Sequence, residues 1–256
     1  MLERPAAAPA AAPATAPVPL YFLSFATNKY RSTLERIRKQ AEDFGIFSEI
    51  FCLSESDIEP EFWNAHKDFI EQNPQGHGCW IWKPHIVHKV FQSLPENSVL
   101  FYCDAGCTLF KEGIPRFMRY INHTLHSKYD NLSFQMNLPE KQFTRQSIMK
   151  HFNYSNGHTG QLLSGIFFLK KTNFTANLVQ LWKDASQNYN LIGNVSSAEL
   201  HYEDSEFIEN RHDQSIFSVI RKIYGTSSIR DETFFGPPPA HENFKQYPIH
   251  ATRLKY

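Results

Sequence analysis

The chain has 256 residues, enough for one sizeable domain or two small ones, and carries 26 Lys and Arg against 26 Asp and Glu. A formal net charge of zero argues against a nucleic-acid-binding protein, because such proteins carry a basic excess, but it permits a local basic pocket for one small anion. Aromatic residues make up 14% of the chain, which favours a large packed core with rings left over for stacking on ligands.

Residues 1–19 are rich in Ala and Pro. The repeated Pro breaks any continuous apolar helix, so this segment is predicted to be a disordered tail or linker and not a signal peptide. We expect residues 20–256 to form one domain, and the start leaves open that this domain is one module of a larger multi-domain enzyme. No apolar run approaches the length that spans a membrane.

Two observations bear on the compartment. The four cysteines show no zinc-like spacing and are expected to be reduced, which favours a cytoplasmic protein: Cys52, Cys79, Cys103 and Cys107. The alternative is a domain of the Golgi lumen separated from an anchor, where N-x-S/T sequons carry meaning. Such sequons begin at Asn122, Asn131, Asn153, Asn173 and Asn194.

The predicted elements begin as strand, helix, strand. An apolar run at 20–25 predicts the first strand. Residues 29–45 predict a helix, with Leu34, Ile37, Ala41 and Phe44 at helical spacing and Gly45 as its stop. Residues 47–54 predict the second strand. This order is typical of a parallel α/β sheet.

Further elements follow along the chain. Helices are predicted from Pro60 to Asn73 and from Pro84, whose ring suits a first helical turn, to Leu94. The remaining predictions are strands at 98–106, 132–138 and 161–172, the last interrupted by Gly165, helices at 114–126, 173–189 and 211–225, and an extended tail over 237–256 that wraps the surface. Together they predict a single α/β domain.

Asp104 ends the apolar run at 98–103 and is followed by Ala105 and Gly106. Ligands of open α/β sheets bind beyond the carboxyl ends of the strands, where Asp104 is expected to lie. A carboxylate there can hold a divalent cation, whose charge neutralises a diphosphate. The alternative is an Asp that caps a turn.

The loop after the first strand offers Thr27, Asn28, Tyr30 and Arg31. Tyr30 could stack on a nucleoside and Arg31 could pair with phosphate, or Asn28 could simply cap a helix beside a solvated Arg. Neither a Gly-x-Gly-x-x-Gly motif nor a Walker loop occurs in the sequence, which disfavours a dinucleotide dehydrogenase and a P-loop nucleotidase.

Trp82 and Lys83 stand at a predicted helix start, which is a natural anion site if the rings are not core. Gln161, Ser164 and Gly165 open an apolar strand, and Gly165 would let a ligand approach the backbone.

His212, Asp213 and Gln214 lie at another predicted helix start. They indicate a catalytic base or a metal ligand, or else helix capping by Asp213.

The ordered segments WIWKP, VLFYCDAGC, SGIFFLKKT, RHDQSIF and PIHATR resemble a group of small nucleotide-sugar glycosyltransferases with the GT-A fold, found in bacterial polysaccharide loci and large DNA viruses. The resemblance covers most of the chain after residue 20, and its specificity lies in the ordered set. It implies a GT-A-like, Rossmann-like mixed sheet, mainly parallel and flanked by helices, in a single domain.

The resemblance also implies roles for residues. Asp104 corresponds to the first carboxylate of an Asp-x-Asp motif, with Gly106 at the second, so a Mn²⁺ or Mg²⁺ ion would rest on Asp104, diphosphate oxygens and water. The nucleotide- and donor-binding set then comprises Thr27, Asn28, Tyr30, Arg31, Trp82, Lys83, Asp104, Ser164, Gly165, His212 and Gln214.

The expected activity is transfer of a hexose or deoxyhexose from a nucleotide-diphosphate sugar, with UDP favoured, to a glycan acceptor, with no nucleic-acid partner. Asp213 would deprotonate the acceptor in an inverting enzyme or hold the donor sugar in a retaining one. Two alternatives stay open: another metal-dependent nucleotide enzyme, and a non-catalytic carbohydrate-binding domain.

Overall fold

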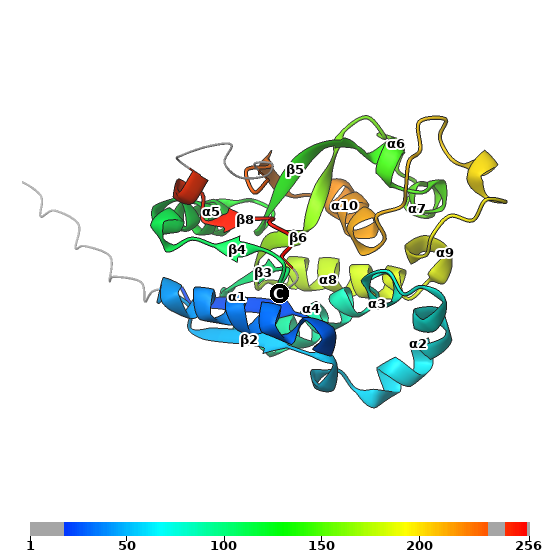
Figure 1. Cartoon of the computed structure of the whole chain (residues 1–256). Helices are drawn as coiled ribbons and strands as arrows, with labels where there is room; N and C mark the ends of the chain where they lie inside the picture. The colour runs from blue at the N-terminus through cyan, green and yellow to red at the C-terminus, as the bar shows by residue number, and fades with distance from the viewer. Residues whose placement is uncertain (1–17, 235–243, 255–256) are drawn as a thin grey trace, which may run out of the picture.

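A six-stranded mixed sheet organises the computed structural model, which describes residues 18–234 and 244–254 (Figure 1). Its strand order is β2 (Glu49–Leu53), β1 (Leu20–Phe25), β3 (Val99–Cys103), β6 (Gly160–Lys170), β5 (Asn131–Pro139) and β7 (Ser227–Arg230). β6 runs antiparallel to both of its neighbours, and the other pairs are parallel. The predicted α/β domain with a mixed, mainly parallel sheet is confirmed.

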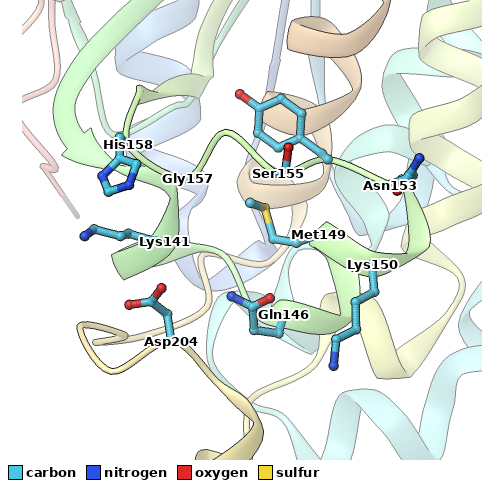
Figure 2. A pocket seen from close by; sticks show the side chains of 10 residues that line it. Lys141, Gln146, Met149, Lys150, Asn153, Ser155, Gly157, His158 and Asp204 are labelled. Atoms are coloured by element: carbon cyan, nitrogen blue, oxygen red, sulfur yellow. The ribbon is translucent and has the colours of Figure 1, made fainter.

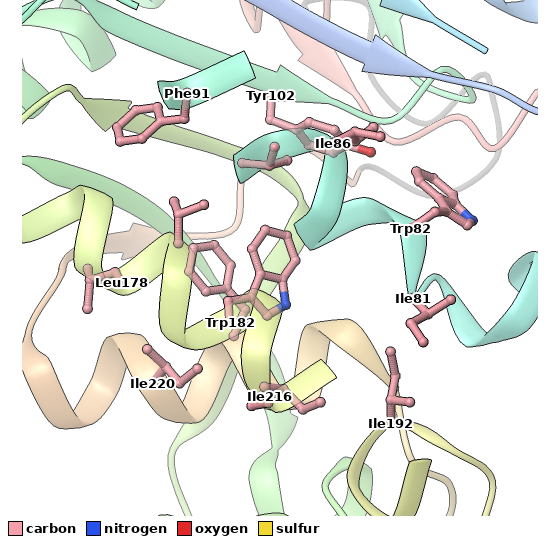
Figure 3. Close-up of a cluster of buried hydrophobic side chains, with 14 of the residues drawn as sticks. Ile81, Trp82, Ile86, Phe91, Tyr102, Leu178, Trp182, Ile192, Ile216 and Ile220 are labelled. Atoms are coloured by element: carbon pink, nitrogen blue, oxygen red, sulfur yellow. The ribbon is translucent and has the colours of Figure 1, made fainter. Parts of the chain in front are cut away.

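Helices cover both faces of the sheet because successive strand residues point to opposite sides. Leu23, Leu100 and Phe167 face the core under α2 (Pro60–Gln72), α4 (Trp82–Ser93), α8 (Asn173–Ser186) and α10 (Asp213–Tyr224). Figure 3 shows this core around Trp182. Phe22 and Phe101 face the second core, which α1 (Arg31–Phe44) and α5 (Ile114–His126) cover.

Long elements with clear periodicity lie where the sequence predicts them. α1 ends at Gly45, whose φ of 63° is the left-handed conformation of a helix C-cap. α4 starts at Trp82, two residues before Pro84. The short elements lack a sequence signal and were not predicted: α3 (Gly76–Cys79), β4 (Thr108–Leu109), α6 (Glu140–Phe143), α7 (Gln146–His151), α9 (Tyr189–Ile192) and the 3-10 turns Asn28–Tyr30, Glu55–Asp57, Lys111–Gly113, Leu200–Tyr202 and Phe244–Gln246.

Gly165 does not interrupt its strand, contrary to the prediction. β6 runs from Gly160 to Lys170 and pairs with β3 up to Ile166. What changes around Gly165 is the register with β5, which shifts between Ser133 and Gln135. The shift leaves the strand continuous and alters only which residues of β5 it faces.

The C-terminal segment is part of the core and does not only wrap the surface. β8 (Ile249–His250) pairs antiparallel with β4, and Ile249 is 1% exposed. The predicted tail at 1–19 lies outside the described residues up to residue 17, and so do residues 237–243 and 255–256 of the predicted C-terminal extension.

All four cysteines carry free thiols. None of the helices in the described ranges combines the length and the apolar character that crossing a bilayer requires.

Replacing Ile249 by Ala tests whether the C-terminal segment is part of the core. The cavity left at this buried site should lower the free energy of unfolding by about 2–4 kcal/mol in urea denaturation. Ile223, which is 39% exposed on α10, is the matched control, and Ile223→Ala should change it by less than about 0.5 kcal/mol. Equal effects of the two changes would show that β8 contributes no core packing.

Candidate functional site

A buried ammonium group joins two carboxylates at the carboxyl edge of the central sheet. Lys83 is the second residue of α4, and its side chain is 3% exposed. Its Nζ lies 3.1 Å from Oδ1 of Asp104, directly after β3, and 3.5 Å from Oδ2 of Asp213, the first residue of α10. The fold thus brings together three predicted site residues that lie far apart in the sequence. We call them the Lys83 cluster.

Hydrogen bonds fix both carboxylates. The Tyr102 hydroxyl donates to Oδ1 of Asp104 at 2.8 Å, and the Ser164 hydroxyl donates to Oδ2 of Asp213 at 2.7 Å. Tyr102 was not predicted as a site residue. Its spacing could have indicated it, because residues two apart on a strand share a face.

The absence of a side chain at Gly165 makes room for Asp104. The backbone N–H of Asp104 donates to the carbonyl of Gly165 at 2.8 Å, so the two residues lie against each other. A Cβ at position 165 would lie 2.6 Å from Oδ2 of Asp104. The group that approaches Gly165 is thus the Asp104 carboxylate, and the approach of a ligand to this backbone stays a prediction.

The two carboxylates of the cluster differ in their burial, and burial shifts the pKa of the inner one. Burial raises the pKa of Asp213 to about 6, against the opposing effect of Lys83. Burial alone would lower the pKa of Lys83, but Asp104 and Asp213 outweigh it and the pKa is raised, so the ammonium stays charged. With both carboxylates ionised the cluster carries one net negative charge. Its accessible member is Asp104, at 39% exposure, against 4% for Asp213.

A pocket of about 340 Å³ lies beside the ends of β1 and β2. Three predicted residues, Thr27, Asn28 and Arg31, line it, together with Arg38, which was not predicted. Arg38 donates from Nη2 to the carbonyl of Cys52 at 3.3 Å. Its spacing of seven from Arg31, two turns along the same helix face, is a signal that could have identified it.

Three predicted ligand residues are turned away from this edge. Trp82 is 5% exposed and stacks on Phe25 with ring centroids 4.1 Å apart, so its ring is core. His212 is 3% exposed, and its Nδ1 is hydrogen-bonded to the carbonyl oxygen of Ile192 at 2.7 Å. Tyr30 packs against the second core and does not line the pocket.

Ser164 and Gln214 stay together beside Asp213. The backbone N–H of Ser164 donates to Oε1 of Gln214 at 3.2 Å. Both residues therefore belong to the surroundings of the Lys83 cluster, and their role in a sugar pocket stays a prediction.

A second cavity, of about 350 Å³, lies by α6 and α7 (Figure 2). Gln146 and Met149 project into it from α7, and Lys141 and Asp204 flank it on one side. None of the predicted site residues lines this cavity, so it is separate from the Lys83 cluster.

The donors around Asp104 do not fit a resident divalent ion. Oδ1 of Asp104 is already bonded to Tyr102 and Lys83, and Gly106 stands at the second carboxylate position. In the described part of the chain no group of three His, Cys, Asp or Glu residues could hold a metal. One carboxylate oxygen supplies only a small part of the six or more oxygen ligands that hard cations take. The Mn²⁺ or Mg²⁺ expected at Asp104 stays a prediction without a matching set of ligands.

The sequence matches no protein-family model and no curated protein. Among solved structures, the chain is similar to a glycosyltransferase involved in the glycosylation of the major capsid of PBCV-1 (10% identity, 91% of each chain covered, TM-score 0.45). It is also similar to mouse xyloside xylosyltransferase 1 (9% identity, 85% of this chain and 87% of that one, TM-score 0.42) and to the galactosyltransferase LgtC (12%, 91% and 84%, TM-score 0.42). At TM-scores below 0.5 these similarities do not assign a function.

Asp213→Asn tests the raised pKa of the buried carboxyl. Its pKa rises from an ordinary 3.8 to about 6 on folding. The folded state therefore holds the proton more tightly, and the stability that this group contributes, full below pH 3.8, is lost as the pH rises through 6. Relative to Asp213→Asn, the wild type should lose about 1 kcal/mol of unfolding free energy between pH 5 and pH 7.5 in urea titrations. Asp43→Asn, on the exposed side of α1, corrects for the loss of one charge. A constant difference at both pH values would contradict the assignment.

The small number of metal ligands at Asp104 also predicts how the melting temperature responds to a metal ion without nucleotide. Because one free carboxylate oxygen is a weak site, Mn²⁺ without nucleotide should leave the melting temperature unchanged, and EDTA should have no effect. The measurement is a thermal-shift titration of the wild type and of Asp104→Asn. Stabilisation by Mn²⁺ that Asp104→Asn abolishes would show a resident metal site after all.

Proposed function

We propose that the chain is a glycosyltransferase that moves a hexose or deoxyhexose from a nucleotide-diphosphate sugar, with UDP favoured, to a glycan acceptor. The observation that carries the proposal is the partly exposed carboxylate of Asp104, held by Lys83 at the end of β3, with a polar pocket at the ends of β1 and β2, the next strands of the sheet. A carboxylate and a polar pocket along one edge of the sheet suit a ligand with a polar neutral part and an anionic part.

The nucleoside diphosphate occupies the pocket in this proposal. Arg38 and Arg31 supply positive charge, although Arg31 also pairs with Glu35, a further lining residue, at 3.1 Å. Thr27, Asn28 and Ser54 supply polar groups. Guanidinium groups suit phosphate oxygens because their donors form a planar fork. Lys83, which the resemblance assigns to the donor phosphates, is instead engaged by two carboxylates. The arginines therefore stabilise the negative charge that develops on the leaving diphosphate.

The donor sugar lies against the exposed side of Asp104 in this proposal. In the transfer, the bond between the anomeric carbon and the diphosphate oxygen breaks, and the diphosphate leaves with the electron pair. A bond to the acceptor oxygen forms, and the acceptor hydroxyl gives up its proton. Asp213, the sequence-based candidate for this proton, is 4% exposed and its Oδ2 is bonded to Ser164 and Lys83. The carboxylate of Asp104, whose side chain is 39% exposed, is better placed to contact the reacting groups and to accept this proton.

Asp104→Asn and the double change Arg31→Ala with Arg38→Ala should separate chemistry from binding. Asp104→Asn should lower the turnover of a UDP-sugar by roughly 100-fold or more, while calorimetry finds UDP binding unchanged. The double arginine variant should weaken UDP binding by roughly 10-fold or more, because charge-assisted hydrogen bonds are lost. Arg119→Ala, a change at an exposed arginine of α5, controls for the loss of positive charge.

A screen of UDP, GDP and their sugars by thermal shift identifies the donor.

Undiminished transfer by Asp104→Asn would remove this residue from the mechanism. Stabilisation by free glycans with no response to any nucleotide would overturn the proposal in favour of a carbohydrate-binding domain.

A further inference from the structure

Gln161, the second residue of β6, is fully buried, and its side-chain amide can take one orientation. Its Nε2 lies 3.0 Å from the carbonyl of Phe143 and from the hydroxyl of Thr144, and 3.2 Å from the hydroxyl of Ser215. A carboxylate oxygen of Glu140 lies 3.4 Å away. All four of these atoms are able to accept a hydrogen bond from the amide.

The two hydroxyls cannot reverse this arrangement. Thr144 already donates its proton to Glu140, and Ser215 donates to the carbonyl of Phe143 at 2.7 Å. Each hydroxyl has one proton to give, so toward Gln161 both can only accept. The nitrogen of the Gln161 amide must therefore point to this group, and its oxygen must point the other way.

The fixed amide of Gln161 sets the amide of Gln214. Oε1 of Gln161 accepts from Nε2 of Gln214 at 2.7 Å. The backbone N–H of Ser164, which can only donate, bonds the oxygen of Gln214 at 3.2 Å, so Gln161 and Ser164 together hold this amide in one orientation. The hydroxyl of Ser164 continues to Asp213 at 2.7 Å. The hydrogen bonds from Ser164 N–H through Gln214 and Gln161 thus all run toward buried Glu140, while the Ser164 hydroxyl donates the other way, to the Lys83 cluster.

Gln214 is half-buried, whereas Gln161 is inaccessible. Each amide has two N–H donors and two lone pairs, and Gln214 uses one of each in these hydrogen bonds. One donor and one lone pair of this amide remain outside them. An amide turned by 180° would exchange the donor and the acceptor that a sugar hydroxyl meets.

We propose that Gln161 is a positioning residue that fixes the amide direction of Gln214 and so determines which sugar hydroxyl geometry the site accepts. This inference rests on the proposed function for its ligand, a nucleotide-diphosphate sugar, but its structural part concerns this chain alone. Gln161 touches no ligand and acts through Gln214.

Gln161→Met keeps the length of the side chain and removes the acceptor that orients Gln214. The side-chain amide signals of Gln214 in ¹H–¹⁵N spectra, assigned with Gln214→Glu, should shift or broaden. The kcat/KM for the nucleotide sugar should fall by roughly 10-fold, since about one hydrogen bond to the sugar is lost. The Kd of the free nucleoside diphosphate should not change.

Ser218→Ala is the matched control. Ser218 donates to Glu140 on the side of the network away from Gln214, so its loss should reduce stability and leave the Gln214 signals and kcat/KM unchanged. Unchanged Gln214 signals in Gln161→Met would overturn the inference, and so would an equal fall of kcat/KM in Ser218→Ala. A wild type that binds no nucleoside diphosphate overturns the proposed function instead, and the Gln214 signals still decide the role of Gln161.

Discussion

The ammonium group of Lys83 is the interaction on which this edge of the molecule depends. Two carboxylates placed close together repel each other, and Lys83 lies within 3.5 Å of both. Because the ammonium is almost fully buried, its removal leaves two carboxylates without a countercharge and costs about 3–5 kcal/mol. The pair of contacts therefore ties the start of α4 to the end of β3 and to the start of α10.

The direction of β6 determines what surrounds this ammonium. Since β6 is antiparallel to β3, Ile166 lies beside Cys103, and the start of β6 reaches the edge where β3 ends. Ser164 and Gly165 thereby come next to Asp104 and Asp213. A parallel β6 would place its other end, near Lys170, at this edge. One reversed strand thus supplies the hydroxyl and the open space that the site needs.

Features that depend on residues close together in the sequence could be predicted. Features that depend on contacts between segments far apart in the sequence could not. The apolar spacing of α1 and the position of Asp104 after an apolar strand are local patterns, and the structure has both. Lys83 was expected to face phosphate, but its partners come from two remote segments. Trp82 was predicted to contact a ligand, but Phe25, from β1, stacks on its ring. A single sequence gives no signal for such pairings.

The distribution of charge orients any anionic ligand at this edge. The Lys83 cluster has one net negative charge when its carboxylates are ionised, so it repels phosphate and favours hydroxyl groups. Arg31 and Arg38 stand at the neighbouring pocket, which attracts phosphate. β1 lies between β2 and β3 in the sheet, so the two regions adjoin along one edge. A nucleotide sugar can satisfy both with its diphosphate toward β2 and its sugar toward β3. The reversed orientation would place phosphate against Asp104. If the proposed nucleotide sugar binds here, the order of the three parallel strands gives it one orientation before any specific contact to the base or the sugar is made.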